Sequence, residues 1–180
     1  MKRFTGSLIL LALLLGGAAH AQFVVDRVET RRTEQGFRVD VHLELGLTDA
    51  AEQALAHGVP LIVVHEIALT RDGWLWDSVQ QRSSERYRLR YHALSGRYVV
   101  DSDSAVLDTF RTVNDALEHM SSTSAVFEPP DESTGYAIAV RSRIDINALP
   151  APLRPTALFS PQWQLSSDWT QWPVNVSTTN

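Results

Sequence analysis

Five arginines stand at alternate positions in two segments that are rich in strand-forming residues. They are Arg86, Arg88 and Arg90 in one segment and Arg141 and Arg143 in the other. Because successive side chains of a strand point to opposite faces, the arginines of each segment project from one face. The planar guanidinium pairs with carboxylate or phosphate groups through two hydrogen bonds. This spacing indicates a contact surface for an anion or an acidic partner.

The same arginines also have a purely structural interpretation. Ion pairs with Asp40, Glu44 or Asp145 on neighbouring strands would make them part of the scaffold, each pair contributing up to about 1 kcal/mol. Exposed charges commonly pair across strands, so we favour this interpretation, although the arginines remain the best candidates for a contact. The deciding observation is whether they converge on one patch or each face an acid.

Tryptophans form the second group of candidate contacts. Trp74 and Trp76 stand two residues apart after a turn, and Trp163, Trp169 and Trp172 gather near the C-terminus. Neighbouring indoles can form a platform for a sugar, a peptide or a lipid, but a half-buried packing role is more common for tryptophan. The sequence leaves open whether the C-terminal tryptophans are buried or exposed.

Motifs for catalysis and metal binding do not occur in their usual form. His65-Glu66 resembles the start of a zinc-hydrolase motif, but position 69 is Leu and the context predicts a strand rather than a helix. The absence of cysteine excludes disulfides and thiolate chemistry. No phosphate-binding Gly-rich loop or serine nucleophile elbow is present. We therefore expect a non-enzymatic protein without catalytic, metal-binding or cofactor-binding residues.

The first 21 residues have the features of an export signal. Lys2 and Arg3 precede an apolar run over residues 8–15, and small residues lead to Ala21 and Gln22. The run is shorter than the roughly 20 residues that cross a membrane. We expect cleavage between Ala21 and Gln22 and a periplasmic or secreted protein with no membrane span after signal removal.

The charge of the chain bears on its partners. It has 16 basic and 21 acidic residues, and removal of Lys2 and Arg3 with the signal leaves 14 and 21, a net charge of −7. Nucleic-acid binding requires a cationic surface that neutralises phosphates, so a nucleic-acid partner is disfavoured.

Patterns of apolar residues predict a mainly β protein. The alternation or continuous apolar runs typical of strands cover residues 23–32, 36–47, 59–71, 84–92, 97–101 and 136–146. Two short helices are predicted over residues 49–58, with Asp49 as N-cap, and over residues 109–121. Turns between adjacent strands indicate antiparallel sheets.

A sheet with one apolar face must cover that face. We predict a single domain over residues 22–180, an antiparallel two-layer β-sandwich of the Ig-like kind, with a half-open β-barrel as the alternative. Residues 150–180 form a tail with five of the eight prolines and three tryptophans. Proline cannot donate to a central ladder and indoles avoid water, so the tail should pack along an edge or over a surface.

Three strings support a family resemblance. They are residues 54–61 (ALAHGVPL), residues 87–94 (YRLRYHAL) with Tyr98-Val99-Val100 after them, and residues 149–155 (LPAPLRP), which lead to the tail tryptophans. Together they resemble a bacterial envelope family, the proline-rich signal-peptide proteins grouped as domain of unknown function 4390. The resemblance implies an envelope compartment and no catalytic residues.

These observations lead to one main hypothesis and one alternative. We expect an exported recognition module whose contacts are the five arginines and the tail tryptophans. Its partner would be another envelope protein, such as the outer domain of a membrane sensor, or an anionic envelope component. The alternative is a carrier that encloses a small apolar or lipid-like ligand between its sheets, with the tail as a lid.

Overall fold

The computed structural model describes residues 23–34, 36–71, 78–103, 107–128 and 135–174. The expected export signal lies outside these residues. So do Trp74, Trp76 and the turn predicted before them.

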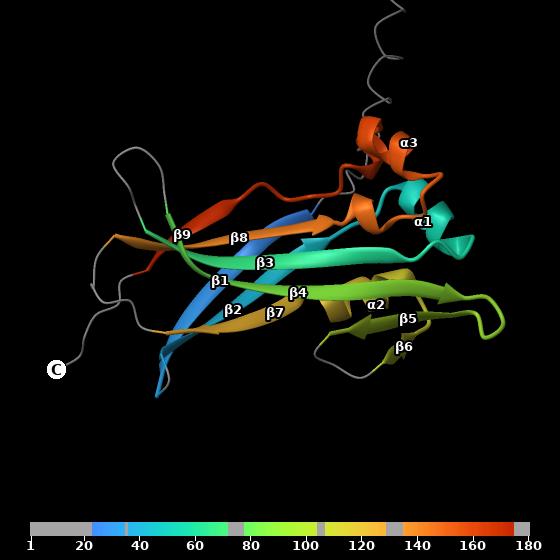
Figure 1. Cartoon of the computed structure of the whole chain (residues 1–180). Coiled ribbons are helices and arrows are strands. Elements are labelled where there is room, and N and C mark those ends of the chain that lie inside the picture. The colour runs from blue at the N-terminus through green and yellow to red at the C-terminus, as the bar shows by residue number, and fades with distance from the viewer. Residues whose placement is uncertain (1–22, 35, 72–77, 104–106, 129–134, 175–180) are drawn as a thin grey trace, which may run out of the picture.

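Two antiparallel sheets make up most of the described part of the chain (Figure 1). One sheet has the strand order β1-β2-β7, and the other has the order β6-β5-β4-β3-β8-β9. The strands are β1 (Phe23–Thr33), β2 (Gly36–Leu45), β3 (Leu61–Arg71), β4 (Ser78–His92), β5 (Arg97–Ser102), β6 (Asp108–Phe110), β7 (Ser122–Phe127), β8 (Tyr136–Ile144) and β9 (Thr170–Val174). In these residues each sheet keeps two edge strands instead of closing into a barrel, so the predicted mainly β fold with two antiparallel sheets is confirmed.

Short helices lie at the ends of the sheets. They are the α-helices α1 (Asp49–Ala56), α2 (Val113–Met120) and α3 (Arg154–Phe159) and the 3-10 helices η1 (Ile146–Ala148) and η2 (Pro161–Trp163). None of the helices in the described residues has the length and apolar composition that crossing a membrane requires.

Both predicted helices exist, but each begins at a different residue than expected. Thr48, not Asp49, caps α1, because its Oγ1 accepts a hydrogen bond from the backbone N–H of Ala51 at 3.3 Å. In the second case Thr112 caps the helix by accepting from Asp115 N–H at 3.1 Å, so α2 is shorter than residues 109–121. Residues ahead of this cap extend instead and pair with β5 as β6.

Strands β7 and β9 were not predicted from the sequence. β7 pairs with β2, where Val39 lies opposite Ala125. β9 belongs to the tail and pairs with β8, with Pro173 opposite Ala137 at the edge of the sheet. Residues 78–83, which precede the strand predicted over residues 84–92, extend β4 to a length of 15 residues.

One hydrophobic core lies between the two sheets. Val39 of the smaller sheet and Leu69 and Ile138 of the larger sheet are all fully buried in the same cluster. Burial of a side chain of this size contributes about 1.5 to 3 kcal/mol. The odd-numbered positions of β3 therefore face inward along most of the strand, and its even-numbered positions face outward.

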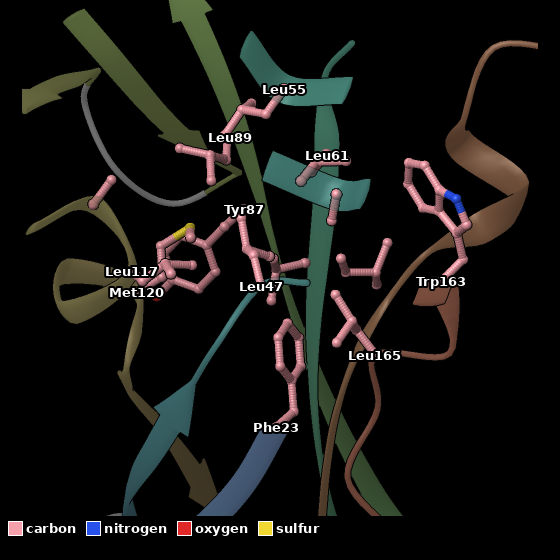
Figure 2. Close-up of a cluster of buried hydrophobic side chains, with 14 of the residues drawn as sticks. Phe23, Leu47, Leu55, Leu61, Tyr87, Leu89, Leu117, Met120, Trp163 and Leu165 are labelled. Carbon is pink, nitrogen blue, oxygen red and sulfur yellow. The ribbon is translucent and has the colours of Figure 1, made fainter. Parts of the chain in front are cut away.

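A second core joins the sheets to the helices (Figure 2). Figure 2 shows Trp163 and Leu165 of the tail packed toward Leu61 of β3, with Phe23 of β1 below them. Leu55 of α1 enters the same cluster. The tail is thus part of the packed interior at this end.

Candidate functional site

The outer face of the six-stranded sheet carries the candidate site. We call it the arginine face and define it by six residues: Arg82, Arg86, Arg88 and Arg90 of β4 and Arg141 and Arg143 of β8. Strand β3 lies between β4 and β8, with Val64 opposite both Arg86 and Arg143. All five arginines that the sequence singled out therefore come together on one face. Arg82 was missed, although its even position on β4 marks the same side.

Glu66 of β3 is surrounded by three of these arginines. Its Oε2 accepts hydrogen bonds from Arg141 Nη2 at 2.7 Å and Nε at 3.3 Å, and from Arg143 Nε at 3.3 Å. Arg82 Nη1 lies 3.6 Å from Oε1. Burial alone would raise the pKa of the Glu66 carboxyl, but the hydrogen bonds and charges of Arg141 and Arg143 hold it below its ordinary value.

Asp145, at the end of β8, holds the next pair. Arg86 Nη2 donates to its Oδ2 at 2.7 Å, and Arg143 Nη1 lies 3.8 Å from its Oδ1. Burial acts to raise the pKa of Asp145, and these two arginines and the Asn147 N–H outweigh that effect and lower it. The expected pairing with Asp145 is therefore confirmed.

The other two expected acids lie on the other sheet. Asp40 and Glu44 lie on β2, in the three-stranded sheet, and so cannot face the arginines of β4 and β8. Asp40 pairs with Arg31 at 3.2 Å and with Arg38 at 2.8 Å.

Asp101 of β5 is the third carboxylate of the arginine face. Its Oδ2 accepts a hydrogen bond from Arg90 Nη2 at 3.2 Å and lies 3.7 Å from Arg88 Nη1. Neither Asp101 nor Glu66 was expected as a partner. The sequence shows on which face of its own strand each acid lies. Which arginines it meets depends on which strands are neighbours in the sheet.

Each arginine has an acid within 4 Å, yet positive charge is in excess. Among the residues that the structure describes, six guanidiniums share three carboxylates, those of Glu66, Asp101 and Asp145. Arg97 of β5 and the nearby Asp103 add one charge of each sign. The chain as a whole has 16 basic and 21 acidic residues, so subtracting the six arginines and three acids leaves 10 and 18. The arginine face is a cationic area on an otherwise acidic protein.

The two strands expose their arginines to different degrees. The side chains of Arg86, Arg88 and Arg90 on β4 are 44%, 57% and 45% exposed, whereas those of Arg141 and Arg143 are about 30% exposed. Arg88 and Arg86 also line a surface depression of about 320 Å³ whose apolar lining includes Pro60, Ile62 and Ala148. The β8 arginines hold Glu66, and the β4 arginines face solvent.

The three tail tryptophans have three different environments. Trp163 is only 7% exposed and belongs to the core, so it is not available to a partner. Trp172 on β9 is half-buried against the core between the sheets. Trp169 is 39% exposed and lies beside the arginine face, with its ring centre 4.7 Å from Arg141 Cζ and 5.9 Å from Arg82 Cζ.

A buried histidine and serine form a contact that the sequence did not indicate. His65 Nε2 lies 2.9 Å from the carbonyl oxygen of Met120, and Nδ1 lies 2.9 Å from Ser142 Oγ. Because a carbonyl only accepts, Nε2 carries the hydrogen, and Nδ1 accepts from the serine. Burial lowers the pKa of His65 to about 4, although the Met120 contact and the charge of Glu85 act to raise it.

The His65 contact is structural and does not form a reaction centre. A serine nucleophile needs an open approach to its substrate, and Ser142 is 0% exposed while His65 is 1% exposed. Glu66 points to the opposite face of β3, so the His65-Glu66 pair cannot act together on a metal. In the described ranges, no group of three or more histidine or acidic side chains is placed to hold a metal ion.

The fold and this site define a mainly β protein of two antiparallel sheets with an arginine-rich outer face. The chain belongs to the family described as Domain of unknown function (DUF4390), whose model matches residues 20–173. The resemblance found in its sequence strings is thereby confirmed. No curated protein and no solved structure significantly matches the chain.

Proposed function

We propose that this protein is an exported, non-enzymatic recognition module that binds an anionic partner through the arginine face. The observation that carries the proposal is the sharing of three carboxylates by six arginines in a chain that is otherwise acidic. Ig-like sandwiches use two packed sheets as a rigid frame for a contact surface, and we propose the same use for these two sheets.

Electrostatic complementarity supports this function. A cationic area on an acidic protein orients an approaching anion and raises the association rate, and it repels partners of the wrong charge. Arg86, Arg88 and Arg90 are the expected contacts, because they are more exposed than the β8 arginines. Trp169 contributes an aromatic surface at the side of the face. The partner would be another envelope protein or an anionic envelope component.

Binding to defined polyanions tests the proposal. The purified protein is titrated with poly-L-glutamate and, separately, with vesicles that contain phosphatidylglycerol, at low and at physiological salt. We expect salt-sensitive binding to at least one probe, and a loss of about tenfold, or about 1.4 kcal/mol, in the double variant Arg88→Glu/Arg90→Glu.

A matched variant controls for net charge. Arg31→Glu/Arg38→Glu makes the same charge change on the three-stranded sheet, where both arginines pair with Asp40. We expect it to retain most of the binding. Equal losses in the two double variants, or no binding of either probe by the wild-type protein, would contradict the proposal.

Export is tested separately. The proposal rests on the charged start, the apolar run and the small residues before Gln22. N-terminal sequencing of the protein from a fractionated bacterial host should give a chain that begins at Gln22, outside the cytoplasm. A full-length chain in the cytoplasm would remove this part of the proposal.

The carrier for an apolar ligand stays a prediction from the sequence. Its ligand would have to lie between the sheets, where Val39, Leu69 and Ile138 are fully buried in one hydrophobic cluster. Native mass spectrometry of protein from its own host measures directly whether a small molecule is retained.

A further inference from the structure

We infer that the partner of the arginine face is an extended acidic segment of another protein, with carboxylates on alternate residues, lying along β4. This inference rests on the proposed function and names the class of partner. The argument starts from the row formed by Arg86, Arg88 and Arg90.

The spacing of this row matches an extended chain. The three arginines occupy consecutive same-face positions of one strand, and such positions repeat every 6.6 to 6.8 Å, roughly. Side chains on one face of another extended segment repeat at the same distance. An acidic residue at every second position can therefore meet one arginine after another without a loss of register.

The β4 arginines have hydrogen-bond donors left for a partner. A guanidinium has five N–H donors. In the described part of the chain, Arg88 makes one ion pair, to Asp101 at 3.7 Å, and Arg90 makes one hydrogen bond to the same oxygen at 3.2 Å. Arg86 makes one hydrogen bond, to Asp145. Most donors of the row therefore have no partner among the described residues, and the three side chains are 44% to 57% exposed.

The protein's own carboxylates show the type of contact that the face favours. Arg141 binds Glu66 through Nε and Nη2 together. Glu66 is 8% exposed, so this carboxylate is held in place although burial disfavours its charge. A carboxylate from a partner would find the same chemistry on the more exposed β4 side.

A membrane surface is a poorer match than an acidic protein segment. Peripheral membrane binding combines cations with apolar side chains that insert beside them. On the outer face of β3, Val64 and Ala68 are 2% and 1% exposed and Ile62 is partly buried, so this face has no fully exposed aliphatic side chain on β3 to insert. The exposed indole of Trp169 is stacked on Arg141. Leu158 and Phe159, which are exposed apolar side chains, belong to α3 rather than to this face.

Two peptides of identical composition test the inference. One alternates glutamate and serine over twelve residues, and the other repeats Glu-Glu-Ser-Ser over the same length, so that no two of its glutamates stand two residues apart. Fluorescence anisotropy with labelled peptides and the purified protein measures both affinities at the same salt concentration. We expect the alternating peptide to bind at least about fivefold more tightly, and Arg88→Glu/Arg90→Glu to remove that preference.

The control variant Arg31→Glu/Arg38→Glu should keep the preference. Circular dichroism and urea unfolding establish that each variant is folded, and Arg88→Gln/Arg90→Gln replaces the charge reversal if it is not.

The outcomes separate this inference from the proposed function. Equal binding of the two peptides, lost in Arg88→Glu/Arg90→Glu, would overturn the alternating segment and leave the recognition function standing. Binding of phosphatidylglycerol vesicles without binding of either peptide would assign the face to a membrane and would also overturn the inference. Failure of the peptides, poly-L-glutamate and the vesicles would overturn both.

Discussion

The guanidinium of Arg141 stacks on the indole of Trp169, with its Cζ 4.7 Å from the ring centre, and its Nη2 donates to Glu66 at 2.7 Å. One arginine thus connects the tail to the middle of the six-stranded sheet. Backbone contacts act beside it, since Ser167 N–H donates to the carbonyl oxygen of Ser142 at 2.8 Å and Ser167 Oγ accepts from Ser142 N–H at 2.9 Å. The tail is held to β8 by both kinds of contact.

The contact of Trp169 predicts a modest stability effect. Trp169→Ala should lower the free energy of unfolding by about 1 kcal/mol, because a partly exposed cation–π contact contributes about 0.5 to 1 kcal/mol. Trp163→Ala should cost about 3 to 5 kcal/mol, because that indole is buried in the core. Urea unfolding measures both. Phe159→Ala, at an 86% exposed position, should change the value by less than about 0.5 kcal/mol, and equal effects at positions 163 and 169 would contradict the assignment.

Glu66 should stabilise the fold through its ionised form. Glu66→Gln leaves Arg141 and Arg143 without their shared counter-charge and should cost about 1 to 3 kcal/mol at neutral pH. The pKa of Glu66 is lowered in the folded state, so its stabilisation is complete above the ordinary value of 4.5 and is lost as the pH falls through the lowered value. Urea unfolding at several pH values between 7 and 3 should give a shallower loss for Glu66→Gln than for the wild type.

The matched control for this measurement is Glu29→Gln. Its side chain is 44% exposed and pairs with Arg27 at 3.7 Å and with Arg31 at 3.5 Å, so its contribution should stay below about 1 kcal/mol. A cost at Glu29 as large as that at Glu66 would show that general charge balance, and not the buried pairing, is responsible.

His65 should make the protein less stable at mildly acidic pH. Its pKa is lowered from 6.5 to about 4 in the folded state, so the unfolded chain binds the proton more readily between these values. The stabilisation is complete above pH 6.5 and is lost as the pH falls toward 4. From pH 7 to pH 5 this loss is about 2 kcal/mol at 1.36 kcal/mol per pKa unit.

The comparison that isolates this effect uses His65→Gln. Thermal unfolding at pH 7 and pH 5 should show a smaller difference in Tm for this variant than for the wild type. His57→Gln changes an exposed histidine at the end of α1 and should leave the wild-type difference intact. If His65→Gln kept the pH dependence of the wild type, His65 would not be the source of the loss of stability at acidic pH.

Gly36 should be intolerant of any side chain. Its φ is +147°, and an added Cβ would lie 2.0 Å from the carbonyl oxygen of Phe127 on the neighbouring strand β7. The clash is with a backbone atom, which cannot move aside as a flexible side chain can. Gly36→Ala should therefore lower the free energy of unfolding in urea by more than about 2 kcal/mol. Gly96→Ala also has a positive φ, of +61°, but meets open space. Its expected cost is about 1 kcal/mol, and an equal cost at both sites would contradict the clash.

Local patterns were sufficient to predict many of the elements. The alternation of residues 36–47 predicted β2 and its buried face, because the side-chain period of two is a property of the extended backbone itself. Strands β7 and β9 were not predicted because each is a short edge strand, of six residues in β7 and five in β9. The first three residues of β7 are polar and β9 contains Pro173, and both strands gain their stability from the strand beside them.

The even spacing of the arginines, the apolar periods and the family strings are all local, so the sequence alone determined a mainly β protein with arginines gathered on strand faces. Only the tertiary structure decided that the arginines of β4 and β8 share one face. It also decided that Glu66 and Asp101, rather than Asp40 or Glu44, pair with them. It also decided that Trp163 is buried while Trp169 lies on Arg141. The physical reason is that pairing between distant strands depends on how the whole chain closes around its cores, and no local period specifies which strand will be the neighbour.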